Sequence, residues 1–596
     1  MLAGPHDAVP GAEHSDKTAC LQAEKCLNDF FHGQLVGGML LPLTACPSAA
    51  GVAMLSGGFP GVKSFLSFSF AGTPTMSTAA DGYVTDVAYT PGFYPHMAPV
   101  AMRYVAALNR VVPPKINAGF RYLELGCGLG RSLTTLAAAN PQGEFIGIDL
   151  NPAHTAAIEK DIAAGGLTNA RVITADFGHL PKDLGSFDFI ALHGVFSWVA
   201  PTVRDTLVAL AKKRLAPGGL LLVSYNAMPG WAHLQPIRGI LRQYALLRQG
   251  DSVQRMRDAL AYLVFIRDKQ AKYFEDNPRA AAYVDSLIKQ DVNYLVHEFL
   301  NEHWTSFYFS EVAGMFGSAG LAFVGSLPVF TNFWDLCVRP EFQDLFRTTT
   351  NRLVTESHKD FCANTAFRWD IYANAPRLMP EVLDRLRDAD DLFFRTTRAG
   401  ITLPYQANLG VVTSTVQGPL YQSLLDLLSG KSRRLSEILS APEFKGTAPV
   451  DLTRAVDAGV AMGLFDVTAG PISETTIDPA SRLVLPSAFN KALLASDSLG
   501  GRAVALASVA TGTGHHLGDF DAAILHELVT HGRDDIAARI ETRLANSGRA
   551  LQQNGQPITD SNERSKLVQQ SCDAFFTVGL PQLARLGIIS EEANKT

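Results

Sequence analysis

A glycine-rich turn at residues 126–130 is the clearest chemical signal in the sequence. Gly126, Gly128 and Gly130 alternate, and Glu124 stands two residues upstream in an apolar run. A strand that passes through such a turn into a helix is typical of nucleotide sites. Dinucleotide folds use the spacing G-x-G-x-x-G and hold a pyrophosphate at the helix N-terminus. Here the spacing is G-x-G-x-G. The carboxylate before the turn suits a cationic group, such as an amine or a sulfonium.

Two more acids end the next two apolar runs. Asp149 stands where a carboxylate accepts the two hydroxyls of a ribose. Asp176 is followed by Phe177, so an acceptor for an adenine amino group lies beside a ring that can cover the base. Any one of these acids alone would more simply cap the helix after its strand. Three acids together with the glycine turn favour a nucleoside site.

Alternating strands and helices must position these acids. Strand patterns occur at 122–126, 144–150, 170–176, 187–194 and 218–226, with helical stretches between them. This alternation predicts an α/β fold with a doubly wound parallel sheet, in which ligands bind outside the carboxyl ends of the strands. A helical middle region and a mixed α/β C-terminal region should follow. In the latter, residues 419–439 predict two short helices broken at Gly430, which could be half of a winged helix.

The quoted motifs resemble those of class I S-adenosylmethionine-dependent methyltransferases. "LELGCGLG", "GIDL", "ITADF" and "LAPGGLLLVSY" are similar to the successive motifs of that family, over about residues 83–232. The resemblance implies a Rossmann-like domain with S-adenosylmethionine as cofactor. It places Glu124, Gly126 and Gly128 along the methionine and ribose, Asp149 on the ribose hydroxyls, and Asp176 with Phe177 at the adenine. The remaining predicted cofactor contacts are Tyr94, Cys127, Leu150 and His193.

Aromatic residues near the strand ends are candidates for the acceptor site, because in this family the acceptor usually enters after the fourth strand. A free lysine has a pKa of about 10.4, so its ammonium must lose a proton before methylation. An apolar aromatic channel lowers that pKa by desolvation, and rings can hold the cation. We predict catalytic roles for His193 as proton relay, for Asn226 as a carbonyl facing the amine, and for the rings of Trp198, Tyr225 and Trp231. Alternatively, these rings are core or cofactor walls and His193 bonds only to backbone.

A longer resemblance concerns the acceptor. "HGVFSWV", "SYNAMPGW" and "YLVHEFLNEHWTSFYFSEVAGMFGSAGLAFVGS" look like bacterial methyltransferases with an appended methyltransferase regulatory domain, a group that includes rickettsial-type protein-lysine methyltransferases. The resemblance implies lysine methylation of a protein, such as an outer-membrane or surface protein, and a homodimer. Two alternatives stay open. One is a small-molecule methyltransferase of the same fold with a helical lid. The other is a non-catalytic S-adenosylmethionine-binding regulator.

Composition limits the partners. The net charge of −6 offers no general attraction to nucleic acid or anionic lipid. Residues 120–232 hold nine Lys and Arg against nine Asp and Glu. The Asn- or Asp-Pro-Pro-Tyr motif of DNA amino-methyltransferases does not follow the fourth strand, so a nucleic acid acceptor is not expected. Seven scattered cysteines without a CxxC pair indicate a reducing compartment, so we expect a cytoplasmic protein. No apolar run is long enough to span a membrane.

Neither histidine-rich stretch predicts a metal site. In "HEFLNEHW" the two histidines are six residues apart instead of four, and His515-His516 has no upstream partner at ligand spacing. The expected domains are a disordered extension over 1–75, or translated sequence upstream of a start at Met76, a cofactor-binding domain over 76–235, a helical region over 236–400 and a C-terminal domain over 401–596.

Overall fold

The structure is a computed structural model of the chain. It describes residues 82, 84, 86–87, 91–475, 477–478, 481–497, 503–547, 551–553, 556–558 and 560–592. The predicted extension over 1–75 lies outside the described residues. No helix in the described part is long and apolar enough to cross a bilayer.

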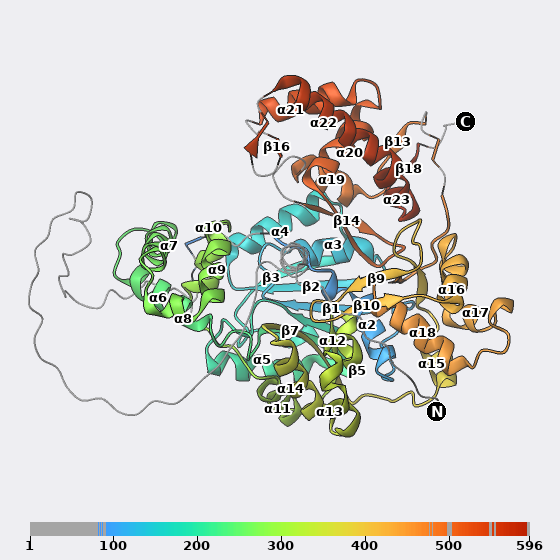
Figure 1. Cartoon of the computed structure of the whole chain (residues 1–596), viewed down its shortest axis with the longest axis horizontal. Helices are drawn as coiled ribbons and strands as arrows, with labels where there is room; N and C mark the ends of the chain where they lie inside the picture. The colour runs from blue at the N-terminus through green and yellow to red at the C-terminus, as the bar shows by residue number, and fades with distance from the viewer. Residues whose placement is uncertain are drawn as a thin grey trace, which may run out of the picture.

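A seven-stranded sheet forms the centre of the molecule (Figure 1). Its strand order is β3-β2-β1-β4-β5-β7-β6. Strands β1 to β5 are parallel, whereas β7 is antiparallel to both of its neighbours. The direction of strand addition reverses between β1 and β4, and ligands of open α/β sheets bind at such a switch point. The strands are β1 (Phe120–Leu125), β2 (Gly143–Asp149), β3 (Ala170–Thr174), β4 (Phe187–Leu192), β5 (Leu215–Asn226), β6 (Leu321–Leu327) and β7 (Phe367–Asn374).

Helices cover both faces of the sheet, which confirms the predicted fold class. Phe120 and Tyr122 of β1 pack on the face covered by α2, α3 and α4, whereas Leu123 and Leu125 pack on the face covered by α5 and α11. The two sets alternate because successive side chains of a strand point to opposite faces. These helices are α2 (Pro99–Leu108), α3 (Arg131–Ala139), α4 (Pro152–Ala164), α5 (Pro201–Arg214) and α11 (Phe309–Ser318).

The helical middle region forms a separate bundle at the left of Figure 1. Trp231, Met256, Leu263 and Phe299 lie in its buried core. The bundle consists of α6 (Gln235–Leu246), α7 (Ser252–Asp268), α8 (Lys272–Asp276), α9 (Pro278–Leu287) and α10 (Val292–Phe299).

The predicted helical region over 236–400 needs a correction after this bundle. The chain returns to the sheet and adds β6 and β7, so a boundary at residue 235 divides strands of one sheet. Sequence patterning missed β7 because Arg368 and Asp370 break its apolar run, and both are buried in ion pairs. The helices between β6 and β7 are α12 (Trp334–Cys337), α13 (Gln343–Thr348) and α14 (Arg352–Ala363).

The C-terminal region has two parts. The first contains a three-stranded sheet of order β11-β8-β12 with helices around it, and α16 and α17 are separated near Gly430 as predicted. Its elements are α15 (Val382–Asp388), β8 (Phe393–Thr396), β9 (Tyr405–Asn408), β10 (Thr413–Val416), α16 (Pro419–Ser429), β11 (Arg433–Arg434), α17 (Leu435–Leu439), α18 (Pro449–Ala461) and β12 (Phe465–Thr468).

The second part lies at the top of Figure 1 and has its own buried core. Its hairpin β14–β15 packs near α3, where the Asn140 amide donates to the Gly512 carbonyl over 3.0 Å. Its elements are β13 (Leu483–Val484), α19 (Ala488–Asp497), β14 (Val504–Ser508), β15 (Thr513–Leu517), α20 (Asp519–His531), α21 (Ile536–Asn546), β16 (Gln552–Gln553), β17 (Gln556–Pro557), α22 (Ser561–Ala574), α23 (Leu580–Arg585) and β18 (Ser590–Glu591).

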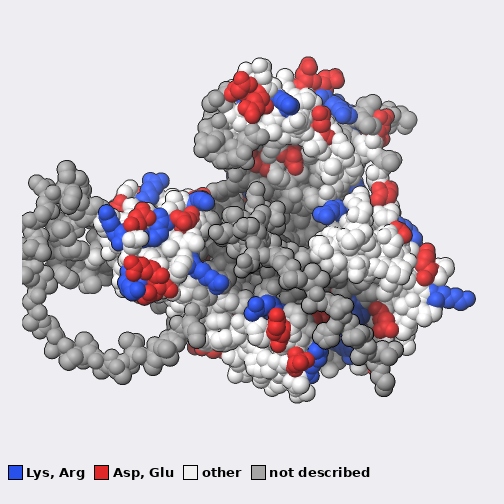
Figure 2. Space-filling model, in the orientation of Figure 1, with Lys and Arg blue, Asp and Glu red and all other residues white. Residues whose placement is uncertain are grey.

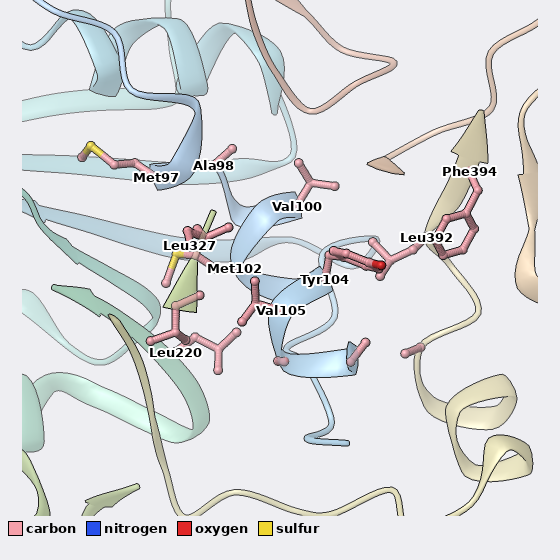
Figure 3. Packing of buried hydrophobic residues seen from close by; sticks show 14 of the residues in the cluster. Met97, Ala98, Val100, Met102, Tyr104, Val105, Leu220, Leu327, Leu392 and Phe394 are labelled. Carbon is pink, nitrogen blue, oxygen red and sulfur yellow. The ribbon is translucent and has the colours of Figure 1, made fainter. Parts of the chain in front are cut away.

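Helix α2 joins the central sheet to the C-terminal region. Met102, Val105 and Leu220 pack together on the sheet side, and Tyr104 points toward Phe394 of β8 (Figure 3). The Tyr104 hydroxyl donates to the buried Asp457 carboxylate of α18 over 2.9 Å. This contact ties the C-terminal region to α2, the helix that precedes β1 in the chain.

Candidate functional site

A cavity of about 750 Å³ opens at the carboxyl ends of β1, β2 and β4, at the switch point of the sheet. All ten residues predicted to contact the cofactor line it. They come from the segment before α2, the ends of β1 and β2, the glycine turn, and the loops after β2, β3 and β4. They are Tyr94, Glu124, Gly126, Cys127, Gly128, Asp149, Leu150, Asp176, Phe177 and His193.

The glycine turn has a conformation that only glycine adopts easily. Gly126, Gly128 and Gly130 have φ angles of +74°, +54° and +66°, in the left-handed region. A Cβ atom on Gly126 would lie 2.4 Å from Cγ2 of Val195, whereas a Cβ on Gly128 would meet nothing within 4 Å. The turn therefore packs against the loop after β4 at Gly126 and offers open backbone at Gly128.

Glu124 is a buried acid whose charge is not compensated by the protein. Its side chain is 5% exposed, and Oε2 is buried without a hydrogen-bond partner among the described residues. Burial and the nearby charge of Asp149 raise the pKa of Glu124 to about 8. A cationic group in the cavity would satisfy this carboxyl and favour its ionised form.

Asp149 is bound into the turn before any ligand enters. One carboxylate oxygen accepts the N–H of Gly128 over 2.7 Å, and the other accepts the N–H of Asn151 over 2.9 Å. Nδ1 of His154 lies 3.1 Å from the second oxygen. The oxygen that accepts from Gly128 keeps a lone pair for one further donor, which fits a predicted contact with a ribose hydroxyl.

The loop after β3 forms the far side of the cavity. Asp176 accepts the N–H of Gly178 over 2.7 Å and lies 2.7 Å from Nδ1 of His179. The ring of Phe177 reaches the glycine turn, since its Cζ would be 3.8 Å from a Cβ on Gly126. The predicted pairing of an acid with a ring therefore exists in the structure and borders the cavity.

His193 and Trp198 are the two predicted catalytic residues that line the cavity. The His193 ring lies 4.0 Å from the Tyr94 ring, and its Nδ1 lies 2.7 Å from the hydroxyl of Ser224. Burial, and to a lesser extent the nearby His96, lower the pKa of His193 to about 3. An imidazole with this pKa is neutral at pH 7 and is a weak base, which argues against the proton relay that we expected.

The other three predicted catalytic residues do not line this cavity, so their predicted roles need a correction. Tyr225 points to the opposite face of the sheet from His193, where its hydroxyl donates to Asp370 over 2.6 Å. Asn226 is buried at the end of β5. Trp231 packs in the helical bundle, 4.9 Å from Trp304 between ring centres. Successive side chains of a strand point to opposite faces, so Tyr225 lies on the face away from the cavity. The chain enters the helical bundle after β5, so Trp231 packs there.

Several lining residues were not predicted. They are contributed by the start of α3, by the segment that leads into α5 and by the first turn of α5, and include Arg131, Ser132, Val199 and Val203. Ser132 accepts the N–H of Tyr94 over 3.1 Å and so holds the segment before α2 at the cavity. The sequence gives no signal for this contact, because the two residues are brought together by tertiary folding.

Two family models match the chain. Residues 123–219 match the model described as "Methyltransferase domain", and residues 291–374 match "Predicted methyltransferase regulatory domain". The first match covers the glycine turn and strands β2 to β4 of the cavity just described. Residues 123–219 are therefore a class I S-adenosylmethionine-dependent methyltransferase domain. The cavity fits this cofactor, because a buried unpaired carboxyl faces it at Glu124 and open backbone faces it at Gly128.

Similar proteins cover between 45% and 85% of this chain. An uncharacterized protein of Synechocystis is 28% identical over 512 residues, which cover 85% of this chain and 99% of the relative. An uncharacterized protein of Rickettsia prowazekii is 28% identical over 278 residues, 45% of this chain and 48% of the relative. The solved structure of PKMT2 from Rickettsia typhi in complex with AdoHcy has 20% identity and a TM-score of 0.62, over 84% of this chain and 99% of that one. This likeness shows that the fold is shared.

Proposed function

We propose that this methyltransferase transfers the methyl group of S-adenosylmethionine to lysine side chains of a protein. The observation that carries the proposal is the uncharged aromatic wall at the end of β4, formed by Tyr94, His193 and Trp198. The likeness to PKMT2 of Rickettsia typhi and the resemblance of the motifs to protein-lysine methyltransferases support it.

The predicted cofactor contacts assign each part of the cavity to one part of the cofactor. Glu124 and the glycine turn would hold the methionine part and Asp149 the ribose. Asp176 and Phe177 would hold the adenine. When bound, S-adenosylmethionine supplies a methyl group that its sulfonium already activates. The protein's task is then to orient the acceptor and to exclude water, which accounts for most of the rate in such transfers.

The wall at β4 is suited to an amine acceptor. A lysine ammonium that enters an apolar, aromatic site loses hydration, so its pKa falls toward neutrality and a proton leaves to water. Tyr94 and Trp198 can hold the cation during entry through their ring faces. Because His193 has a pKa of about 3, we assign it to the wall and to hydrogen bonding through Nε2 rather than to proton storage.

The face of the helical bundle seen in Figure 2 carries mixed charges rather than a continuous basic surface. Lys and Arg are interspersed with Asp and Glu over the helical bundle at the left of Figure 2. Nucleic-acid binding usually requires a continuous basic surface. The four described cysteines that carry free thiols, Cys127, Cys337, Cys362 and Cys572, agree with our expectation of a cytoplasmic location. A homodimer remains a prediction, and sedimentation of the full chain tests it.

The test is methyl labelling in a lysate of the source cells. Purified protein is incubated with methyl-labelled S-adenosylmethionine, and proteins and small molecules are then separated. We expect label in a protein band, its loss with the Asp149→Asn variant, and its loss when lysine amines in the lysate are first blocked by acetylation. Label that persists after blocking contradicts lysine as the acceptor.

The same experiment separates the alternatives. Label confined to the small-molecule fraction would instead support a small-molecule methyltransferase. No label in either fraction, with cofactor binding intact by calorimetry, would support a non-catalytic regulator.

A further inference from the structure

His193 is held at the cavity by side chains from neighbouring strands. Ser224 of β5 lies 2.7 Å from Nδ1, and the ring of Trp369 on β7 stacks on the imidazole at 4.2 Å with an interplanar angle of 13°. Ser224 and Trp369 are partners in the β5–β7 register, so both supports lie on one face of the sheet. The ring of Tyr94 contacts the imidazole from another side, with 4.0 Å between the two ring centroids.

These contacts fix the orientation of the imidazole and leave its Nε2 atom available to a ligand. The stack sets the plane of the ring, and the hydrogen bond to Ser224 sets its rotation about χ2. Among the described residues, the hydrogen bond of His193 is made through Nδ1, and Nε2 has no partner. The direction of Nε2 in the cavity is therefore decided by Ser224 and Trp369.

Trp369 does not belong to the part of the chain that matches the methyltransferase domain. It lies within residues 291–374, which match the regulatory domain model. Its side chain is 5% exposed, and its indole N–H is buried without a partner in the described part of the chain. Its contribution to the site is therefore the ring face that contacts His193, together with its contact to His96 at 4.9 Å.

The residues beside Trp369 on β7 connect the strand to α14. Arg368 and Asp370 point to the opposite face from Trp369, since side chains alternate along a strand. Arg368 pairs with Asp360 of α14 at 2.7 Å and with Glu356 of α14 at 2.8 Å, and all these groups are buried. Loss of one partner from such a buried network leaves an uncompensated charge, so the network allows few alternative positions. The position of β7, and hence of Trp369, depends on α14.

We propose that Trp369 is a positioning residue for methyl transfer, which orients His193 in the cavity and makes that orientation depend on α14 of the regulatory segment. The proposal rests on the proposed function, because it assumes that methyl transfer takes place in the cavity that His193 lines. It gives the regulatory segment a direct physical route to the reaction: from α14 through Arg368 to β7, and from Trp369 to the imidazole.

The first test is a double-mutant cycle. Trp369→Leu should lower kcat about three- to tenfold, as expected for loss of one stacked-ring contact. Trp369→Phe should restore most of it, and the affinity for S-adenosylhomocysteine should change little in either variant. In a His193→Ala background, Trp369→Leu should have no further effect. An equal loss of kcat in both backgrounds overturns the proposal. Trp334→Leu on α12 is the matched control, because Trp334 lies in the same segment and stacks on Phe346.

The second test needs no methyl transfer. The imidazole resonances of His193 are followed by NMR in wild-type protein, in Trp369→Leu and in Asp360→Asn, which alters α14 without touching Trp369. We expect both variants to shift these resonances and Trp334→Leu to leave them unchanged. Unchanged resonances in Asp360→Asn overturn the connection to α14. If the wild-type protein transfers no methyl group, the proposed function fails, and the NMR result still decides whether Trp369 and α14 position His193.

Discussion

Gly128 donates its backbone N–H to the Asp149 carboxylate over 2.7 Å, so the glycine turn after β1 is tied to the end of β2. The sequence suggested only that Asp149 holds ribose. The structure gives this acid a second role, since it shapes the turn before the cofactor binds.

Asp149→Asn should therefore weaken both the cofactor site and the fold. An amide places an N–H₂ group against the backbone N–H of Gly128 or Asn151, where an acceptor is required. We expect a loss of about 1–3 kcal/mol in the free energy of unfolding and a roughly 10- to 100-fold weaker affinity for S-adenosylhomocysteine. Denaturant unfolding and calorimetry measure the two effects. Glu159→Gln on the exposed side of α4 is the control, and equal behaviour of both variants would contradict the dual role.

Glu124→Gln should stabilise the free protein and impair cofactor binding. The folded-state pKa of Glu124 is about 8, above its usual value of 4.5. Stability is therefore lost as pH rises from about 4.5 to 8, because the folded state retains a proton that the unfolded state releases. A neutral isostere should raise the free energy of unfolding at pH 7 by on the order of 2–3 kcal/mol. Wild type and variant should become equal near pH 4, and a constant difference across pH would refute the assignment.

Cofactor binding should release protons near neutral pH. Glu124 is largely protonated in the free protein below pH 8, the value to which its pKa is raised, whereas a cationic ligand favours the carboxylate. Calorimetry at pH 7 in buffers of different ionisation enthalpy should detect release of up to about one proton per bound S-adenosylmethionine. The Glu124→Gln variant should release less. Identical release from both proteins would exclude Glu124 as the source.

The two glycines of the turn should differ in their tolerance of a methyl group. Gly126→Ala places Cβ 2.4 Å from Val195, whereas Gly128→Ala places it in open space. Both changes carry the cost of a left-handed backbone, about 1–2 kcal/mol. Gly126→Ala should therefore lower the melting temperature more, and Gly128→Ala should mainly reduce cofactor affinity. Thermal unfolding with and without S-adenosylhomocysteine distinguishes them, and the reverse order would show that Val195 moves freely.

Arg368 should be among the most sensitive positions in the regulatory segment. Its guanidinium pairs with Asp360 at 2.7 Å and Asp370 at 3.0 Å in a buried site. Arg368→Ala leaves these carboxylates without a counter-charge and should lower the free energy of unfolding by about 3–5 kcal/mol. Arg377→Ala, which breaks an exposed pair with Asp388, should cost less than about 1 kcal/mol. Chemical denaturation measures both, and similar losses would contradict a buried network.

The sequence by itself predicted which acids gather at the cavity that we assign to the cofactor. Glu124, Asp149 and Asp176 each stand at or just after the end of a strand, and parallel strands bring their carboxyl ends to one edge. Residue type and local period therefore sufficed to gather them at one cavity. The same local logic predicted the helices of the bundle and the break near Gly430.

Only the tertiary structure decided which side chains surround His193 and which predicted residues lie away from it. Tyr225 was expected at the acceptor site, but strand alternation and its hydrogen bond to Asp370 place it on the opposite face. Trp369 reaches His193 because β7 pairs not only with the preceding strand β6 but also with β5, where Trp369 lies opposite Ser224, 145 residues earlier in the chain. Such contacts depend on which distant segments pair and on burial of charges that looked exposed in the sequence. The charge of Arg368 is tolerated inside the protein because α14 supplies Glu356 and Asp360 as partners. Asp370 in turn is held by Arg368 and by the hydroxyls of Tyr225 and Ser326. Local periodicity carries no information about that pairing.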